Sequence, residues 1–361
     1  MAISIPVTRT TSPKAKYSDE RSLGFGNVFT DHMFIANHDP ERGWHDARIV
    51  PYGPLAIDPA SPVLHYAAEI FEGMKAYRHP NDEIGLFRPE QNAARMNRSA
   101  ERMCLPPIDV ELQLAAIEAL VDLERDWVPR SEGTSLYLRP TLIGDGSRLG
   151  VSTAQRHIYF IICSPSGMYY PNGIKPVRIH IEDQYVRTVR GGTGMAKTGG
   201  NYAASLLAST LAGKHGYDQV LWLDGRENRY IEEVGAMNTM FVIDGVLVTP
   251  ALTGGILEGI TRMSVLELAK GFGIPVEERL IPVEELFSAY EAGALTEAFG
   301  TGTAAIISPI GELNYKEKSI ELGTEIGPVA RRIYDALTGI QSGKLPDTRG
   351  WTRIVPRLAT Q

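Results

Sequence analysis

The stretch GGTGMAKTGGNYAAS, residues 191–205, holds one charged side chain, Lys197, with glycines on both sides of it. Glycine lacks a β-carbon, so other groups can come close to the main chain where glycines cluster. A long cationic side chain in such a setting indicates that an anionic or electrophilic group binds beside it. The nature of that group decides the fold and the function, and three kinds of partner can be compared with the sequence.

A nucleotide phosphate is the first candidate, and the spacing argues against it. A P-loop requires glycine directly before its lysine, in the pattern GxxxxGK[ST], whereas Ala196 precedes Lys197. A dinucleotide is the second candidate. The segment GTGTAA, residues 300–305, fits GxGxxA, but the residues after it are typical of a strand and not of the helix that this motif opens. We interpret the segment as a loop whose backbone N–H groups can face an anion.

Pyridoxal phosphate bound to the lysine is the third candidate. Its chemistry requires an uncharged amine, an acid beside the pyridine nitrogen, and backbone N–H groups with a cation for the phosphate. YIEEVGAMNTM offers Glu232 and Glu233 as the acid. Residues 259–261 (Gly-Ile-Thr) open a predicted helix, and Arg95 lies in another. Each feature also has an ordinary interpretation, namely a solvated turn, an N-cap and an exposed arginine.

The composition excludes several classes of function. A net charge of -7 argues against nucleic-acid binding, which normally needs a basic surface. Cys104 and Cys163 are the only cysteines, so we expect two reduced thiols, no disulfide framework and no metal site. No apolar run reaches the roughly 18 residues that span a bilayer, and the N-terminal residues lack a signal-peptide core. We therefore expect a soluble, cytoplasmic protein without a membrane partner.

The length and punctuation of the chain predict two domains. Its 361 residues exceed the roughly 250–300 residues that one core usually reaches, and SPSGMYYPNGIKP has the Pro and Gly content of a linker. We expect a smaller N-terminal α/β domain over residues 1–165, a linker over 166–176 and a larger cofactor-binding C-terminal domain over 177–361. Strands and helices alternate without a regular βαβ rhythm, which predicts an α+β fold with mixed or antiparallel sheets and flanking helices.

Residue patterns also predict individual elements. Helical spacing of apolar residues, or a run of good helix formers, predicts helices over 90–103, 110–127, 202–216, 260–273, 283–293 and 328–337. Runs of β-branched and aromatic residues predict strands over 135–144, 156–164, 177–183 and 219–224. Asp244-Gly245 between two apolar runs predicts a hairpin with a type I′ turn over 240–250.

Eight motifs, read in order, resemble the branched-chain amino-acid aminotransferases, which are fold-type IV pyridoxal-phosphate enzymes. They are FGNVFTDHMF, LHYAAEIFEGMKAYR, LFRPEQNAARMNRSAERM, LYLRPTLIG, GGTGMAKTGGNYAAS, YIEEVGAMN, GGILEGITR and EAFGTGTAAIISPI. The resemblance extends from about Phe25 to Thr303 and beyond. It implies the two-domain architecture of D-amino-acid aminotransferase, pyridoxal 5′-phosphate as cofactor, and at least a homodimer whose pockets are completed by the neighbouring subunit.

The resemblance also implies a role for each matching residue. Lys197 would be the catalytic lysine of the Schiff base, Tyr202 would bind the phenolic oxygen of the cofactor, and Glu233 would keep its pyridine nitrogen protonated. Those implied to bind the phosphate are Arg95, Thr303 and, through backbone N–H groups, Ile260 and Thr261. Those implied to bind the substrate are Phe25, Tyr66, Phe71, Tyr137, Arg139 and Tyr169 around its side chain, with Thr303 and the N–H of Ala304 at its carboxylate.

The implied reaction is ping-pong transamination of L-leucine, L-isoleucine or L-valine with 2-oxoglutarate. Arg139 in YLRP would pair with the second carboxylate of 2-oxoglutarate and fold away from an apolar side chain; a structural arginine between strands is the alternative. Ala305 and Ser308 replace the C-x-x-C pair of some relatives, so no thiol switch is expected, and Ala236 replaces a threonine. A D-amino-acid transaminase, an aminodeoxychorismate lyase and a non-catalytic phosphate-binding protein remain open at this point.

Overall fold

The computed structural model describes residues 3–170 and 173–358, and the chain divides into two compact units. Unit 1 comprises Met1–Pro171, Ala196–Gly199 and Gly339–Gln361, and unit 2 comprises Asn172–Met195 and Gly200–Thr338. The change at 171/172 falls within the expected linker over 166–176, although residues 171–172 themselves lie outside the described part. The units differ from the expected division in that two later segments of the chain belong to unit 1. Each of these segments belongs to unit 1 because it is hydrogen-bonded to residues of that unit.

Unit 1 is built on an eight-stranded sheet in which every pair of neighbouring strands is antiparallel. Its strands are β1 (His32–Asp39), β2 (Gly43–Pro51), β3 (Glu69–Phe71), β4 (Met74–Arg78), β5 (Ile84–Phe87), β6 (Ser135–Asp145), β7 (Arg156–Ser166) and β17 (Thr352–Ile354). Their order is β17-β5-β4-β6-β7-β1-β2, and β3 pairs with β6. β17 pairs with β5, which explains why the end of the chain belongs to this unit.

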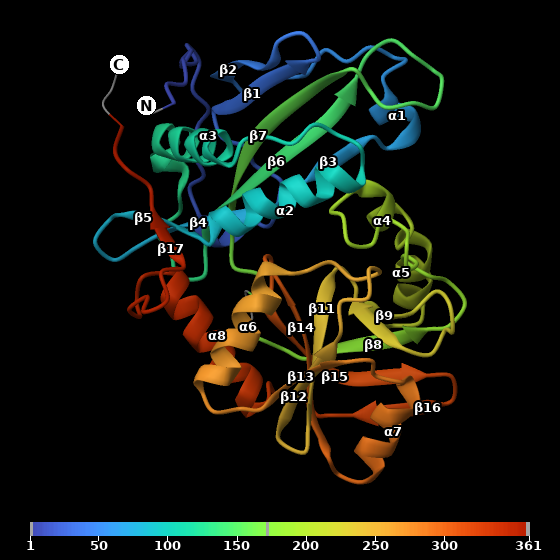
Figure 1. The fold of residues 1–361 in the computed structure, drawn as a ribbon. Coiled ribbons are helices and arrows are strands. Elements are labelled where there is room, and N and C mark those ends of the chain that lie inside the picture. The colour runs from blue at the N-terminus through green and yellow to red at the C-terminus, as the bar shows by residue number, and fades with distance from the viewer. Residues whose placement is uncertain (1–2, 171–172, 359–361) are drawn as a thin grey trace. The chain divides into compact units, whose positions relative to one another are not determined.

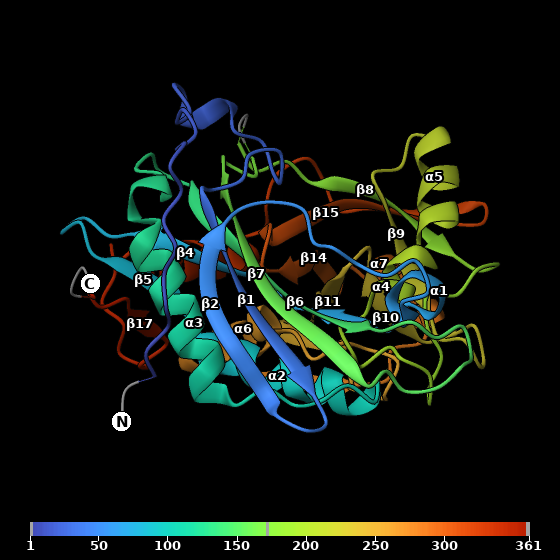
Figure 2. The same cartoon turned by 90° about the horizontal axis from the view of Figure 1, so that it is seen from above.

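Helices cover the unit 1 sheet and close its core. They are the 3₁₀ helices η1 (Glu20–Ser22) and η2 (Arg125–Trp127), and the α-helices α1 (Pro62–Tyr66), α2 (Pro89–Arg102) and α3 (Val110–Leu123). α2 and α3 pack against each other and against strands of the sheet (Figures 1 and 2). Met96 of α2, Leu120 of α3 and Phe34 of β1 are fully buried in one apolar cluster. The helices expected over 90–103 and 110–127 are thus confirmed, the second with a 3₁₀ end.

Unit 2 contains a nine-stranded mixed sheet. Its strands are β8 (Val177–Glu182), β9 (Gln219–Leu223), β10 (Ile231–Val234), β11 (Met237–Ile243), β12 (Val246–Pro250), β13 (Val276–Arg279), β14 (Leu295–Gly302), β15 (Ile306–Tyr315) and β16 (Lys318–Glu321). The order is β10-β9-β8-β15-β14-β11-β12-β13, with β16 beside β15. β10 also pairs with β11, so the strands from β10 to β11 close into a ring. The mixed sheet confirms the expected α+β fold.

The hairpin between β11 and β12 follows its turn residues. Asp244 and Gly245 both adopt left-handed backbone angles, φ 50° and φ 76°, and Ile243 pairs with Val246. A type I′ turn requires positive φ at both central positions, and its twist matches that of the flanking strands. The expected hairpin over 240–250 is therefore confirmed.

The helices of unit 2 follow the apolar spacing with one interruption. They are α4 (Gly199–Ala203), α5 (Leu206–Lys214), α6 (Ile260–Gly271), α7 (Val283–Glu291) and α8 (Pro328–Gln341); Gly199 and the last turn of α8 belong to unit 1. The single helix expected over 202–216 is wrong at Ala204 and Ser205, where α4 and α5 separate. Ser205 donates from both its backbone N–H and its hydroxyl to the carbonyl of Tyr202, and such local bonds compete with the helix.

α6 and α7 both pack against β14, and in Figure 1 they lie on different sides of this strand. α7 contributes Leu286 to an apolar cluster with Phe241 and Ile310 of the sheet. Within the described residues, none of the helices is long and apolar enough to cross a membrane.

Candidate active site

Lys197 is held in unit 1 by hydrogen bonds at both ends of its backbone. Its N–H donates to Ser99 Oγ on α2 at 2.9 Å, and its carbonyl accepts from the N–H of Phe71 at 2.9 Å. The hydroxyl of Thr198 donates to the carbonyl of Glu69 at 2.8 Å, and the Glu69 carboxylate accepts from the N–H of Gly199. These bonds extend from β3 to the lysine segment. They explain why Ala196–Gly199 belongs to unit 1 although its neighbours in sequence belong to unit 2.

Aromatic rings and one guanidinium surround the half-buried Lys197 side chain. Its Nζ lies 4.8 Å from the ring centroid of Phe71, and the Arg139 guanidinium lies 4.7 Å from the same centroid. Arg139 Nη2 donates to the hydroxyl of Tyr137 at 2.9 Å, and the ring of Tyr137 packs edge-on against Phe25, with centroids 4.8 Å apart. The structure thus brings five of the expected site residues together within unit 1.

Strand register explains why Tyr137 and Arg139 share a face. Residues two apart on a strand point to the same side of the sheet, and both lie on β6. Gly73 leaves room for them, because a β-carbon there would lie 2.0 Å from the Tyr137 hydroxyl. The buried Arg139 Nε has no hydrogen-bond partner among the described residues. An unsatisfied buried donor on a cation is suited to a carboxylate ligand.

Arg95 lies on α2, one helical turn before Ser99, and is buried. Its Nε and Nη2 donate to the two carboxylate oxygens of Glu72 at 2.7 and 2.8 Å. Burial raises the pKa of Glu72, but the charge and hydrogen bonds of Arg95, with Lys197 and Asn92, outweigh burial and hold this pKa below its ordinary value. Glu72 is therefore an ionised carboxylate inside the core. The sequence pattern had given it no role.

Glu233 lies in unit 2 on β10, at the pair of strands that closes the ring. Its Oε2 lies 2.6 Å from Arg187 Nη2, and both side chains are buried. Its Oε1 accepts from the N–H of Leu257 at 3.0 Å and from Asn238 Nδ2 at 3.3 Å. Asn238, directly opposite Glu233 on β11, also donates to the carbonyl of Leu257 at 2.8 Å. The carboxylate is thus bonded to the loop that leads into α6.

The N-terminus of α6 has the features of an anion site. Ile260 and Thr261 are its first residues, and Gly259 is the N-cap, without a side-chain cap and without an acidic residue in the first turn. The first N–H groups of a helix have no intrahelical acceptor and carry the positive end of its dipole. A β-carbon on Gly259 would lie 2.1 Å from Asn238 Oδ1, so a larger residue would displace the Asn238 amide from its present position.

A second loop of unit 2 carries further donors. Thr303 and Ala304 lie in the turn between β14 and β15. Thr301 pairs with Asn238, and its buried Oγ1 has no partner among the described residues. Asn238 pairs with Glu233 on one neighbouring strand and with Thr301 on the other. The turn that follows Thr301 therefore begins in the same part of the sheet as the acid. The uncapped start of α6 and the buried Thr301 hydroxyl offer hydrogen-bond donors, and the buried Glu233 carboxylate offers an acceptor; such groups suit a phosphorylated pyridine.

Three further expected residues lie elsewhere in their own units. The hydroxyl of Tyr66 donates to the carbonyl of Leu149, and the ring of Tyr169 packs against Tyr170 with centroids 4.8 Å apart. Tyr202 is half-buried on α4, where its carbonyl accepts from Ser205. Their roles toward a ligand stay predictions.

Sequence reasoning missed several polar residues that support these groups: Glu72, Ser99, Arg187 and Asn238. Glu72 lies in FEGMKAYR, the end of the motif LHYAAEIFEGMKAYR. A carboxylate among the apolar residues of an expected strand was an available signal. Arg187 carried no such signal, because a single arginine in a loop is ordinarily a surface residue.

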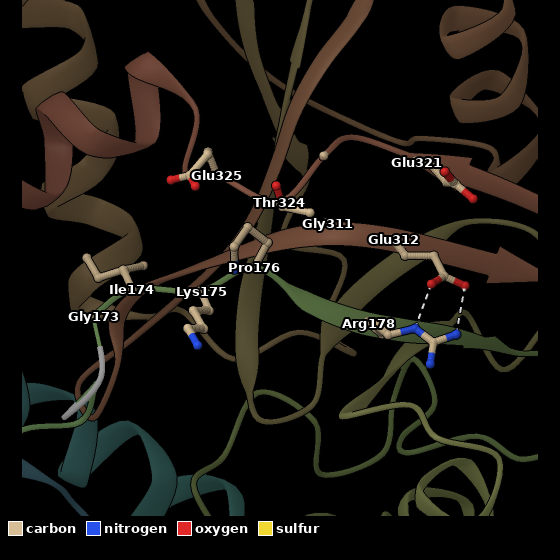
Figure 3. Close-up of a pocket in the computed structure, with 11 residues that line it drawn as sticks. Gly173, Ile174, Lys175, Pro176, Arg178, Gly311, Glu312, Glu321, Thr324 and Glu325 are labelled. Atoms are coloured by element: carbon tan, nitrogen blue, oxygen red, sulfur yellow. Dashed lines mark hydrogen bonds and ion pairs between the residues drawn. The ribbon is translucent and has the colours of Figure 1, made fainter.

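A hollow in unit 2 has a volume of about 750 Å³ and contains none of the expected residues. Its charged groups include Lys175, Glu321 and the pair formed by Arg178 and Glu312, whose Nε and Oε2 lie 2.6 Å apart (Figure 3). Because this pair satisfies itself, the hollow offers no comparable donor set. Among the described residues, no group of three His, Cys, Asp or Glu side chains could hold a metal ion.

Known proteins resemble the chain over most of its length. The Amino-transferase class IV family matches residues 69–313. A probable branched-chain-amino-acid aminotransferase of Staphylococcus epidermidis is 53% identical over 94% of the chain and 95% of that protein. Branched-chain-amino-acid aminotransferase 2 of Bacillus subtilis is 50% identical over 99% of the chain and 98% of that protein.

Solved structures are also similar. The branched-chain amino acid aminotransferase of Escherichia coli matches with a TM-score of 0.75 and 28% identity, over 90% of this chain and 99% of that one. A branched-chain amino acid aminotransferase from T.th., solved with pyridoxamine 5′-phosphate, matches with a TM-score of 0.74 and 28% identity. That match covers 90% of this chain and 98% of the other.

Proposed function

We propose that this chain, which belongs to the class IV aminotransferase family and within it to the branched-chain-amino-acid aminotransferases, transfers the amino group of L-leucine, L-isoleucine or L-valine to 2-oxoglutarate with pyridoxal 5′-phosphate as cofactor. The names of its relatives support the amino-acid class. The pyridoxamine phosphate in the similar T.th. structure supports the cofactor. The co-substrate 2-oxoglutarate, the ping-pong order and the individual residue roles are part of the proposal and do not come from the names of the relatives.

The observation that carries the proposal is the fixed position of Lys197. Its backbone is bonded on both sides, to Ser99 and Phe71, while its side chain extends beside an aromatic ring and Arg139. A lysine that only served solubility would not need two tertiary backbone bonds. A lysine that must hold a ligand in one orientation does, because misplacement of a reactive group lowers the rate steeply.

The residues present suit the cofactor. We assign its pyridine nitrogen to Glu233 and its phenolic oxygen to Tyr202. We assign its phosphate to Arg95, Ile260, Thr261 and Thr303, the middle pair through the N–H groups at the start of α6. When bound, pyridoxal phosphate supplies the electron sink that stabilises negative charge at the α-carbon of the amino acid.

The chain's own groups then perform the proton chemistry. With the cofactor bound, Lys197 Nζ would act as the general base that removes the proton from the substrate α-carbon. Glu233, paired with Arg187, would favour a proton on the pyridine nitrogen. Thr303 and the N–H of Ala304 orient the substrate carboxylate. In this proposal the buried Arg95 of unit 1 and the buried Glu233 of unit 2 each have a role toward the cofactor.

Arg139 would allow the pocket to bind 2-oxoglutarate as the second substrate. Its guanidinium rests on the rings of Phe71 and Tyr137, at 4.7 and 5.2 Å from their centroids, so an apolar side chain meets aromatic surface. Its unsatisfied Nε, together with the neighbouring donors, can pair with the distal carboxylate of 2-oxoglutarate. Phe25, Tyr66 and Tyr169 complete the walls in this proposal.

We further infer a homodimer in the cytoplasm. Leu206 and Leu207 on α5 are 65% and 54% exposed, and Val151 in a loop of unit 1 is 84% exposed. Large exposed apolar side chains that cluster on one helix are typical of an interface. Light scattering coupled to size-exclusion chromatography should give twice the 39.6 kDa chain mass.

The proposal is tested by labelling the lysine. Incubation with pyridoxal phosphate and reduction with borohydride should leave a pyridoxyl group on the peptide that contains Lys197, and Lys197→Ala should lose the label and the transaminase activity. Activity is measured with both enantiomers of leucine and with 2-oxoglutarate. A label on another lysine, activity in Lys197→Ala, or a preference for D-leucine would contradict the proposal.

A further inference from the structure

Glu72 lies in the two-residue connection between β3 and β4, which follow one another along β6, and is 1% exposed. Its carboxylate accepts from Arg95 at two nitrogens, from Asn92 Nδ2 at 2.8 Å and from the N–H of Gly73 at 3.2 Å. A buried carboxylate costs free energy unless its oxygens are satisfied. Glu72 meets that requirement with two side chains of α2 and the N–H of the next residue, so its position is well determined.

The contact with Arg95 fixes the direction of the guanidinium. The pair uses the Nε–Nη2 edge, with one nitrogen on each carboxylate oxygen. A two-point contact between planar groups sets both the plane and the rotation of the guanidinium. Because this edge faces Glu72, the edge that carries Nη1 faces away from that carboxylate. The direction in which Arg95 can receive a phosphate is therefore also defined.

The same segment is bonded to the lysine segment. Phe71, the residue before Glu72, donates its N–H to the carbonyl of Lys197 at 2.9 Å, and Ser99 accepts from the N–H of Lys197 at 2.9 Å. Asn92, Arg95 and Ser99 occupy positions i, i+3 and i+7 of α2 and so share one face of the helix. Residues 71–73 are therefore bonded to the lysine segment and to the arginine on one helix face.

Charge supports this geometry. Arg95 and Lys197 both lower the pKa of Glu72, so its carboxylate is ionised and is close enough to both cations to interact. A buried guanidinium without a counterion would be costly, and it would tend to move toward water or toward another anion. The negative charge of Glu72 also repels a phosphate, but it lies on the opposite edge of the guanidinium. We expect the gain from orienting the Arg95 guanidinium before the phosphate binds to exceed the repulsion between Glu72 and that phosphate.

We propose that Glu72 is a positioning residue of the cofactor site, which holds the guanidinium of Arg95 in the orientation that binds the cofactor phosphate and relates it to Lys197. The inference rests on the proposed function, in which Arg95 binds that phosphate. It assigns the FEG segment a purpose beyond packing. It also predicts that Glu72 affects affinity for the phosphate group more than affinity for the rest of the cofactor.

The test compares two ligands that differ only in the phosphate. Dissociation constants of pyridoxal 5′-phosphate and pyridoxal are measured by absorbance titration of the cofactor-free protein, in wild type and in Glu72→Gln. We expect the ratio of the two affinities to fall about tenfold or more in the variant, because a misplaced charged donor loses a charge-assisted hydrogen bond. Glu72→Asp, which keeps the charge, should recover part of the ratio.

Two controls separate the possible outcomes. Glu124→Gln removes another buried carboxylate of unit 1, bonded to His32, and should lower stability without changing the ratio. Arg95→Met should lower the ratio at least as much as Glu72→Gln. An unchanged ratio in Glu72→Gln with a lowered ratio in Arg95→Met overturns this inference alone.

An unchanged ratio in Arg95→Met overturns the phosphate assignment within the proposed function. If Glu72→Gln does not fold, Glu72→Asp carries the same comparison, with a smaller fall in the ratio expected and an unchanged ratio contradicting the inference.

Discussion

Arg187 and Glu233 form a buried ion pair in unit 2, with Nη2 and Oε2 2.6 Å apart and side chains 7% and 4% exposed. The same Nη2 also donates to the carbonyl of Gly255 at 3.0 Å. Both oxygens of Glu233 therefore receive donors from the protein. The acid that we assign to the pyridine nitrogen is fixed in direction by a residue that no motif had indicated.

Removal of one partner of this pair should destabilise the fold strongly. Arg187→Met leaves the Glu233 carboxylate buried without this cation, and breaking such a pair costs about 3–5 kcal/mol. The double variant Arg187→Met/Glu233→Met should recover part of the loss, because no charge is left unpaired while the N–H of Leu257 still loses its acceptor. Urea unfolding of the cofactor-free protein measures each free energy.

A solvent-exposed ion pair serves as the control for these measurements of unfolding free energy. Arg229→Met breaks the contact with Glu284, whose side chains are 51% and 62% exposed, and it should cost about 1 kcal/mol or less. Equal losses in Arg187→Met and Arg229→Met would show that the buried pair contributes no more than a surface pair.

Glu232 should make stability depend on pH. Burial, reinforced by Glu233 and Asp224 and opposed by Arg187, raises the pKa of Glu232 from 4.5 to about 7, and the residue lines a cavity of about 110 Å³. Because the folded-state pKa is the higher one, the folded protein holds a proton that the unfolded chain has lost between these values. The stabilisation is full below pH 4.5 and is lost as the pH rises through 7, a change of about 3 kcal/mol.

Glu232→Gln removes that titration. Relative to wild type, the variant should gain about 1–3 kcal/mol at about pH 8 and much less at about pH 5, as measured by urea unfolding at both values. Glu227→Gln, at an exposed position nearby, serves as the control and should change little under either condition. A gain in Glu232→Gln that is the same in acid and in base would contradict the assignment.

Two glycines of the lysine stretch should respond in opposite ways to alanine. A β-carbon on Gly194 would lie 2.2 Å from the carbonyl oxygen of Gly255, which is backbone and cannot swing away. Gly194→Ala should therefore cost about 1–3 kcal/mol or more. Gly200 lies in α4, and a β-carbon there would meet nothing within 4 Å.

Gly200→Ala should change stability by less than about 1 kcal/mol, in the favourable direction, because alanine has the higher helix propensity. Thermal unfolding of both variants compares them directly. Equal melting temperatures would mean that the close approach at Gly194 relaxes at no cost.

Arg139→Gln should separate the two substrates. The variant keeps a polar side chain but loses the charge that pairs with a distal carboxylate, so KM for 2-oxoglutarate should rise about 10- to 100-fold. The half-reaction with L-leucine should change only a few-fold, because its side chain meets Phe71 and Tyr137. Single-turnover measurements of each half-reaction provide the comparison, and equal losses for both substrates would favour a structural arginine.

Local features of this protein followed from the sequence where neighbouring residues carry the information. The helix over 90–103 and the turn at Asp244-Gly245 depend on propensity and backbone freedom, which act within a few residues. The break at Ser205 did not follow, because helix formers surround it and the bonds of its N–H and hydroxyl to the Tyr202 carbonyl form only in the folded backbone. Short strands such as β3 also escaped notice, since pairing with β6 defines them.

The sequence by itself determined which residues are chemically available: one lysine among glycines, a downstream acid, a helix that begins with Gly-Ile-Thr, and a set of motifs that identify the family. Only the tertiary structure decided how they are held. Glu72 holds Arg95, Arg187 holds Glu233, and residues 196–199 belong to unit 1. Such relations join residues far apart in the chain, and their free energy depends on burial, which removes water from the charges and makes each partner necessary.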